Sequence, residues 1–179
     1  MSCANRPQFE AENILALVEQ IEKVFGIVKG RLTRKPVVVS SAHKGMTNAL
    51  LAAAEAAAQG KSDAGRELVA KQRAIAASLG CPKDMLDPFF AEIHDLLRGI
   101  ELVKEVSKRS VDYISSFGER MAVRVIADSF TRAGIPSQAF DIWDLGFITD
   151  SNIGEARPVE GYERMMREAF EELVPKGML

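Results

Sequence analysis

Hydrophobic residues recur every three or four positions along most of this 179-residue chain, the spacing of helices that bury one face. The first such stretch runs from about residue 10 to 32, and Lys35-Pro36 breaks it. Glycines at positions 80 and 134 would end two later stretches. The pattern predicts further helices at about 48–59, 64–79, 84–107, 110–132 and 158–173.

Short stretches between these helices have the character of strands. Val37-Val38-Val39 is continuous and β-branched, as in a strand that is covered on both faces. Further strands are predicted at 137–141 and 146–149. Strands that alternate with helices predict an α/β fold with a parallel sheet, here with few strands for so many helices. No repeat or linker divides the chain, so residues 1–179 are expected to form a single domain.

Composition excludes several classes of protein. Hydrophobic residues make up 47% of the chain, enough for one core, and 23 basic against 25 acidic residues argue against nucleic-acid binding. No signal-peptide core and no apolar run of about 18 residues is present, so no membrane contact is expected. Cys3 and Cys81 are isolated, which predicts no metal site and fits a cytoplasmic protein.

The segment from Ser40 to Asn48 is a candidate ligand turn, because it is small and polar between a predicted strand and a predicted helix. Ligands bind at the carboxyl ends of parallel strands, and the start of a helix offers free N–H groups to anions. Ser41 and Thr47 would present hydroxyls to a carboxylate or a phosphate. Alternatively, Thr47 only caps the helix. His43 lies in the same turn without a second metal ligand.

Glu119 is the second candidate, because it lies beside the buried stripe of the helix predicted at 110–132. Gly118 costs such a helix about 1 kcal/mol relative to alanine, which indicates close approach of another helix or a ligand. A carboxylate at this packed edge suits an ammonium group. The alternative is a solvated side chain that pairs with Arg120 or Arg124. The polar segment 150–156 either lines the mouth of a site or is a surface loop, and we favour the loop.

Taken in order, these segments resemble the amino-terminal half of the kinase domain of an aspartokinase, in the amino-acid kinase family. The matching residues are Pro36 to Ala42 with Gly45-Met46-Thr47-Asn48, then Asp112 to Arg120, and then Ala139 to Asp150 with Gly154-Glu155-Ala156. Order and spacing agree from about residue 8 to 175. The resemblance implies the αβα sandwich of that family, here a partial and helix-rich one with a small, mainly parallel sheet.

The resemblance also implies a reaction and a set of roles. Aspartokinases transfer a phosphoryl group from ATP, with magnesium, to L-aspartate, which gives 4-phospho-L-aspartate in the first step toward lysine, threonine and methionine. By the same resemblance Glu119 would bind the α-ammonium group of aspartate in a charge-assisted contact. Thr47 would hydrogen-bond the substrate, and Ser41 would line the phosphoryl-transfer site.

The chain departs from the family where ATP would bind. Gln8-Phe9-Glu10-Ala11 stands in register with the family's Lys-Phe-Gly-Gly, so Gln8 replaces the lysine. An acidic residue such as Glu10 would repel a triphosphate. The later Gly-Arg-Gly-Gly-Ser-Asp segment and the regulatory ACT domains also have no counterpart in these residues. We therefore expect no ATP or magnesium site to be retained, no catalytic residue, and no useful kinase activity from this chain alone.

Three functions remain open at this stage. The chain is a catalytically incomplete aspartokinase domain that keeps affinity for L-aspartate or another small amino acid, or it is a non-catalytic partner that associates with itself or with a full-length kinase. The third possible function is that of one half of a split, two-chain aspartate kinase. Aspartate binding that Glu119→Ala abolishes would favour the first or the third.

Overall fold

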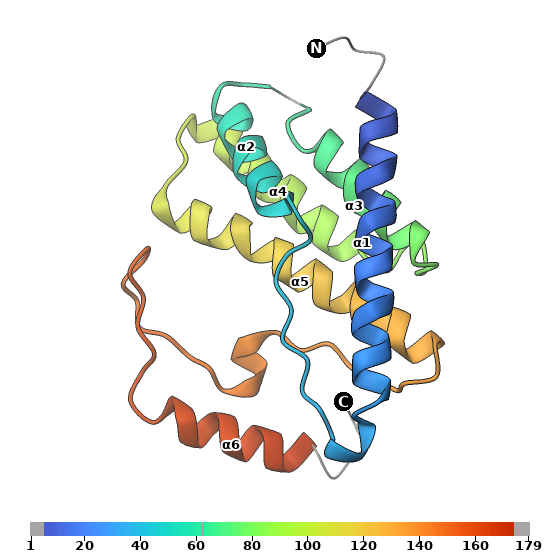
Figure 1. Ribbon diagram of the computed structural model, residues 1–179. Coiled ribbons are helices and arrows are strands. Elements are labelled where there is room, and N and C mark those ends of the chain that lie inside the picture. Colours follow the sequence, from blue (N-terminus) through green and yellow to red (C-terminus); the bar gives the residue numbers. More distant parts are fainter. Residues whose placement is uncertain (1–5, 62, 174–179) are drawn as a thin grey trace.

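The computed structural model describes residues 6–61 and 63–173, with side chains from residue 14 onward. It consists of helices joined by turns and extended segments (Figure 1). The predicted helices are confirmed, with bounds that differ by about one turn at most. None of the described helices is long and apolar enough to cross a membrane. The helices are α1 (Arg6–Lys29), α2 (Met46–Ala58), α3 (Arg66–Ser78), α4 (Asp87–Val103), α5 (Lys108–Arg132) and α6 (Tyr162–Leu173), with 3₁₀ turns η2 (Leu32–Arg34) and η3 (Ile142–Leu145).

The core forms where α2 and α4 pack on α5, which crosses the middle of the molecule (Figure 1). The side chains of Phe117 and Met121 on α5 are completely buried there, as is Leu50 on α2. Three buried alanines of α2 let its neighbours approach closely, because they carry only a methyl group. The central segment of α5 is therefore held rigidly on both sides, which matters because Glu119 lies in it.

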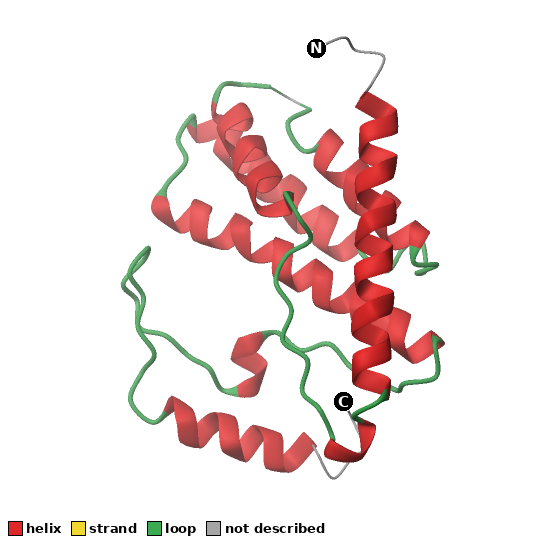
Figure 2. Ribbon diagram, viewed as in Figure 1, coloured by secondary structure: helices red, strands yellow, loops and turns green. Residues whose placement is uncertain are grey.

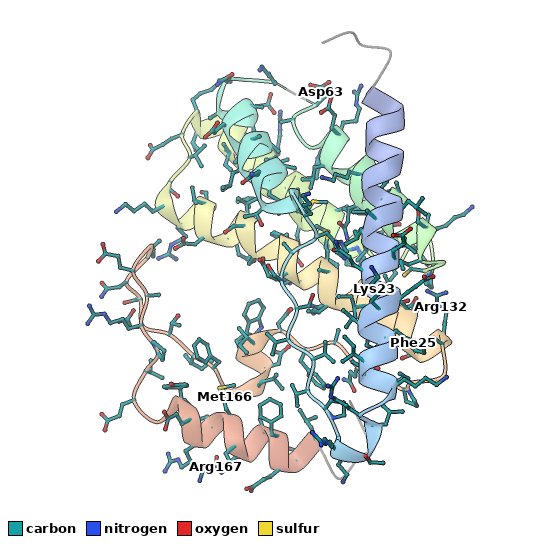
Figure 3. The ribbon with its side chains drawn as sticks, in the orientation of Figure 1. Lys23, Phe25, Asp63, Arg132, Met166 and Arg167 are labelled. Atoms are coloured by element: carbon teal, nitrogen blue, oxygen red, sulfur yellow. The ribbon has the colours of Figure 1, made fainter. Side chains whose placement is uncertain are left out.

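A second, smaller cluster joins α1 to the carboxyl end of α5. Ile21 and Val28 of α1 are buried against Phe130 and Ile135. The Phe25 ring meets the Phe130 ring edge-on, with ring centroids 5.6 Å apart. Figure 3 shows Phe25 on α1 beside the end of α5 that carries Arg132. Through these contacts α1 lies across α3 and α5 and covers one side of the bundle.

The predicted parallel sheet is not formed among the described residues, which contain no named strand (Figure 2). After the left-handed Lys35, residues 36–43 run past α5 without a ladder partner among the described residues, and the Val39 side chain is 93% exposed. Residues 137–141 are also extended but lead into η3. The segments 35–40 and 137–140 line one apolar pocket without pairing. Their β-branched residues favour an extended backbone, whereas a strand also needs a neighbour with which to exchange hydrogen bonds.

The segment predicted as a third strand, 146–149, pairs in the antiparallel sense instead. Thr149 forms an isolated bridge with Pro158. The Val159 N–H donates to the Ile148 carbonyl at 3.0 Å, and the Asp150 N–H donates to the Arg157 carbonyl at 2.8 Å. The intervening loop folds back on itself, so segment 146–149 pairs with residues that are close to it in sequence. This local pairing competes successfully with the parallel arrangement that the pattern predicted.

Residues 137–173 form an arm that lies beside the helical body (Figure 1). Within it, α6 packs on η3, and the Phe147 and Tyr162 rings meet edge-on at 5.3 Å. Figure 3 shows Met166 on the side of α6 that faces the rest of the arm, with Arg167 on the opposite side. The arm thus partly covers one face of α6 with its own loop.

A buried carboxylate ties the arm to α5. Asp141 is 7% exposed and accepts hydrogen bonds from Arg120 Nε at 3.3 Å and from Arg124 at 3.0 Å. The Arg120 guanidinium also lies over the rings of Phe89, Phe117 and Trp143, at 5.1, 4.8 and 5.5 Å from their centroids. Cations are attracted to aromatic faces, so these rings hold Arg120 in place.

We predict that Asp141→Asn loosens the arm. The substitution removes the charge that binds both arginines and should lower the free energy of unfolding by about 1.5–3 kcal/mol, the usual value for hydrogen bonds to charged groups. Urea unfolding measures the loss, and limited proteolysis shows whether cleavage concentrates in residues 137–161. Asp84→Asn, at an exposed position, is the control and should change stability by less than about 0.5 kcal/mol. Equal stability of the two variants would contradict the conclusion that Asp141 ties the arm to α5.

Candidate functional site

The turn of residues 40–47 is shaped by a left-handed glycine. Gly45 has φ of 77° and is the residue that precedes α2. Other residues adopt this backbone conformation only at a cost. No side chain caps the helix, and α2 begins at Met46, so Thr47 lies inside its first turn. The interpretation of Thr47 as only a helix cap is therefore wrong, and its half-buried hydroxyl is directed elsewhere.

Gly118 is where α5 touches this turn. A Cβ atom at Gly118 would lie 2.8 Å from the Cβ of Ala42, and 3.6 Å from both Thr47 Oγ1 and Leu50 Cδ1. A separation below 3.0 Å is closer than two carbon atoms normally approach, so only glycine allows the turn to lie this near the helix. The close approach predicted from Gly118 is confirmed, and its partner is the turn together with the start of α2.

Glu119 holds the turn from the same helix. Its Oε1 atom accepts a hydrogen bond from the Ala42 N–H at 3.4 Å, and the side chain is half-buried. Arg120 and Arg124 instead bind Asp141, and Arg120 also pairs with Glu92 at 3.5 Å. Among the described residues Glu119 has no ion-pair partner. The alternative of a solvated Glu119 paired with these arginines is wrong.

The structure brings the three predicted site residues to one place. Glu119 bonds to Ala42, which directly follows the exposed Ser41, and Thr47 faces the neighbouring Gly118. The Glu119 carboxylate and the start of α2 therefore meet at one short turn, which itself carries the hydroxyls of Ser41 and Thr47. The carboxylate suits an ammonium group, and the positive end of the α2 dipole suits a carboxylate. This combination of charges matches the two ends of an amino acid.

The sequence did not reveal a buried polar pair behind the turn. His43 is 4% exposed, and its Nδ1 atom lies 3.3 Å from Oε1 of Gln72 on α3, which is completely buried. Burial lowers the pKa of His43 below its usual value, the Gln72 hydrogen bond opposes the shift, and the Lys71 charge adds to it. Gln72 occupies the buried stripe of α3 with Leu68 and Ile75. A polar residue in that stripe was the signal that could have identified the pair.

The segment 150–156 is a surface loop, as favoured from its composition. The Asp150 Oδ1 atom accepts hydrogen bonds from the N–H groups of Asn152 and Arg157, at 3.1 and 3.2 Å. The Gly154 N–H donates to Asp112 Oδ2 at 2.9 Å, which attaches the tip of the loop to the first turns of α5. The side chains from Asp150 to Asn152 are exposed.

The positions that stand in register with the family's Lys-Phe-Gly-Gly do not fit ATP and magnesium. Gln8, Glu10 and Ala11 lie within α1, and their side chains are outside the described residues. Gln8 is uncharged and Glu10 is acidic, so neither residue type supplies the positive charge that a triphosphate needs. Within 14–61 and 63–173, no three His, Cys, Asp or Glu side chains gather as they would around a metal ion.

Comparison with known proteins identifies the family of this chain. A family model described as the amino acid kinase family matches residues 7–179. The chain belongs to the amino acid kinase family. Aspartokinase 2, chloroplastic, from Arabidopsis thaliana is 30% identical over 150 residues, which cover 79% of this chain and 27% of that protein. Aspartokinase 1, chloroplastic, from the same plant is 32% identical over 141 residues, 75% of this chain and 25% of that protein.

This amino-acid kinase domain is aspartokinase-like. Aspartokinase 3, chloroplastic, of the same plant is 32% identical over 152 residues, which cover 82% of the chain and 27% of the relative. The chain thus spans about a quarter of the length of these curated relatives. The matched family is consistent with the amino-acid kinase fold expected from the resemblance, whereas the described residues are helical and contain no named strand.

We predict that Gly118→Ala and Gly99→Ala have opposite effects. At Gly118 the added methyl group would meet Ala42 at 2.8 Å. Overpacking costs about 1–3 kcal/mol, which helix propensity offsets by about 1 kcal/mol. Gly99 on α4 has nothing within 4 Å of the added atom, so alanine there should be stabilising by up to about 1 kcal/mol. Urea unfolding compares the two, and a Gly118→Ala variant as stable as Gly99→Ala would show that the turn does not press on the helix.

Proposed function

We propose that this domain binds a small amino acid, L-aspartate by analogy with the kinases it resembles. The observation that carries the proposal is the contact of Glu119 with the turn that holds Ser41 and Thr47. In this arrangement the Glu119 carboxylate takes the α-ammonium group of the ligand. The Thr47 hydroxyl and the start of α2 take a carboxylate, and Ser41 lies at the exposed side of the turn.

The charge balance around α5 supports this role for Glu119. The neighbouring Arg120 and Arg124 are bound by the buried Asp141, and Arg120 also pairs with Glu92, so two carboxylates balance their two positive charges. Glu119 receives only a neutral N–H from Ala42 among the described residues. Its negative charge therefore stays available to a cation, and a half-buried setting strengthens such a contact relative to water.

We further propose that this chain transfers no phosphoryl group by itself. Phosphoryl transfer depends on positioning the triphosphate and neutralising its charge. Gln8 cannot supply the positive charge of the family's lysine, and Glu10 adds a negative one. Glu10 and Ala11 stand where the family has its two glycines and lie in a regular helix, so the close approach that glycines would permit is lost as well.

Isothermal titration with L-aspartate tests the binding site. We expect Glu119→Gln to weaken binding about 10- to 100-fold, because a charge-assisted contact is worth about 1.5–3 kcal/mol. Glu105→Gln, which changes an exposed carboxylate in the turn before α5, is the matched control and should bind as the wild type does. Equal affinity in both variants would remove Glu119 from the site.

An activity assay on the wild type and on Glu119→Gln tests whether the chain is an enzyme. ATP-dependent acyl phosphate formed from L-aspartate is trapped with hydroxylamine, and we expect none above background. Turnover that Glu119→Gln abolishes would overturn the proposal of an inactive domain and would mean that Gln8 is compatible with catalysis.

A second function, association with another chain, is favoured by the extended segment 37–39. The Val37 and Val39 side chains are 56% and 93% exposed, and the segment has no ladder partner among the described residues. Open backbone edges with apolar side chains invite pairing with another chain. A second copy, a full-length kinase or a complementary half of a split kinase would each satisfy this edge.

Sedimentation at increasing concentration tests this association. If the chain pairs with itself, its mass should rise with concentration, and Val39→Lys should suppress the rise because a charge cannot be buried at a paired edge. Leu15→Lys, at a 61% exposed position of α1, is the control and should leave the mass unchanged. A constant monomer mass would exclude self-association.

A further inference from the structure

His43 and Gln72 form a polar contact in the interior, and no catalytic or ligand role accounts for it. His43 is 4% exposed and Gln72 0%. Their one hydrogen bond joins Nδ1 of the imidazole and Oε1 of the amide at 3.3 Å. Burying polar groups is unfavourable unless they are hydrogen-bonded, and both His43 Nε2 and Gln72 Nε2 lack a partner among the described residues. A hydrophobic pair would fill the same space at lower cost.

The position of His43 connects this contact to the candidate site. His43 lies in the turn between Ser41 and Thr47, directly after Ala42, whose N–H binds Glu119. The adjacent residue on α3, Lys71, donates through Nζ to the Lys44 carbonyl at 3.2 Å. Two consecutive α3 residues thus hold the turn from one side while Glu119 of α5 holds it from the other.

The contact selects one form of the imidazole. An amide oxygen only accepts hydrogen bonds, so Nδ1 carries the proton and Nε2 is left with a lone pair. Protonating Nε2 would place a full charge in the interior, near the ammonium group of Lys71. The α1 residues that share the groove with His43 carry no charge, so they cannot compensate a charged imidazole. These α1 residues are Leu17, Gln20, Ile21 and Val24. The Glu119 carboxylate bonds to the N–H of the neighbouring Ala42 instead.

We infer that His43 and Gln72 are positioning residues, whose buried contact sets the turn against Glu119 in the geometry that receives the amino acid. The inference rests on the proposed function and adds to it a dependence on pH. The pKa of His43 is lowered from 6.5 in the folded protein, so the unfolded chain takes up the proton first as the pH falls. Because burial of the imidazole causes this shift, folding stability is fully present above pH 6.5, and part of it is lost as the pH drops through the folded pKa.

The first test uses the ligand-free protein. The chain contains two histidines, and His94, with a 79% exposed side chain, serves as the internal reference. Long-range ¹H–¹⁵N spectra of histidine-labelled protein should show His43 at pH 7 with a proton on Nδ1 and none on Nε2. The imidazole should become charged only below pH 6.5. A proton on Nε2, or a charged His43 at pH 7, would overturn the inference.

The second test asks whether the contact acts on the site. Gln72→Leu should shift the amide signal of Ala42 and weaken L-aspartate binding about 3- to 10-fold, the range for loss of one neutral hydrogen bond. Gln72→Glu keeps an acceptor for Nδ1, so it should restore binding and raise the pH at which His43 becomes charged. Gln59→Leu, at an exposed glutamine at the end of α2, is the matched control.

The outcomes separate this inference from the proposed function. Wild-type protein that binds no aspartate would refute the proposed function, while the Ala42 signal and the state of His43 still decide on the contact. An Ala42 signal that Gln72→Leu leaves in place would refute the inference even if aspartate binds. If Gln72→Leu fails to fold, the titration of His43 in Gln72→Glu decides instead. A raised pH at which His43 becomes charged supports the inference, and an unchanged pH refutes it.

Discussion

The close packing of the 40–47 turn on Gly118 is the constraint on which the rest of the structure depends. A side chain at that position would lie within 2.8 Å of Ala42, so the missing Cβ permits α2 and α5 to meet at the turn. That meeting places Glu119 on the Ala42 N–H and Thr47 beside the helix. Phe117 and Met121, which are both completely buried, lie on either side of the same point on α5 and keep the helix from moving away.

Charge is distributed along α5 so that adjacent residues have different tasks. Arg120 and Arg124 are bound by Asp141 and by aromatic rings, which attaches the arm to the helical body. Because these cations are balanced there, Glu119 keeps its charge for the turn. Behind the turn, His43 and Gln72 place a neutral contact where a charged one would be unfavourable. A single helix thus joins a structural ion pair to a site suited to an ammonium group.

The two kinds of secondary structure differed in how well they could be predicted from the chain. The helix at 110–132 was predicted nearly to its bounds, because its periodicity and its hydrogen bonds are both local. Val37-Val38-Val39 was predicted as a strand and is extended without a ladder partner in the described part of the chain. The site was likewise predictable only in part. Gly118 indicated a close contact, but the sequence did not indicate that Ala42 would be the partner. Gln72 was missed, because its role depends on a histidine 29 residues away.

The sequence by itself determined the family, the helices and the residue types of the candidate site, because each is encoded in short motifs or in periodic burial. By resemblance it also places Gln8 and Glu10 where the family has a lysine and a glycine. Only the tertiary structure decided that Glu119 faces the turn rather than an arginine, that His43 is buried against Gln72, and that the extended segments remain unpaired. These outcomes depend on which distant segments pack together, and that packing is a property of the whole chain that no local pattern contains.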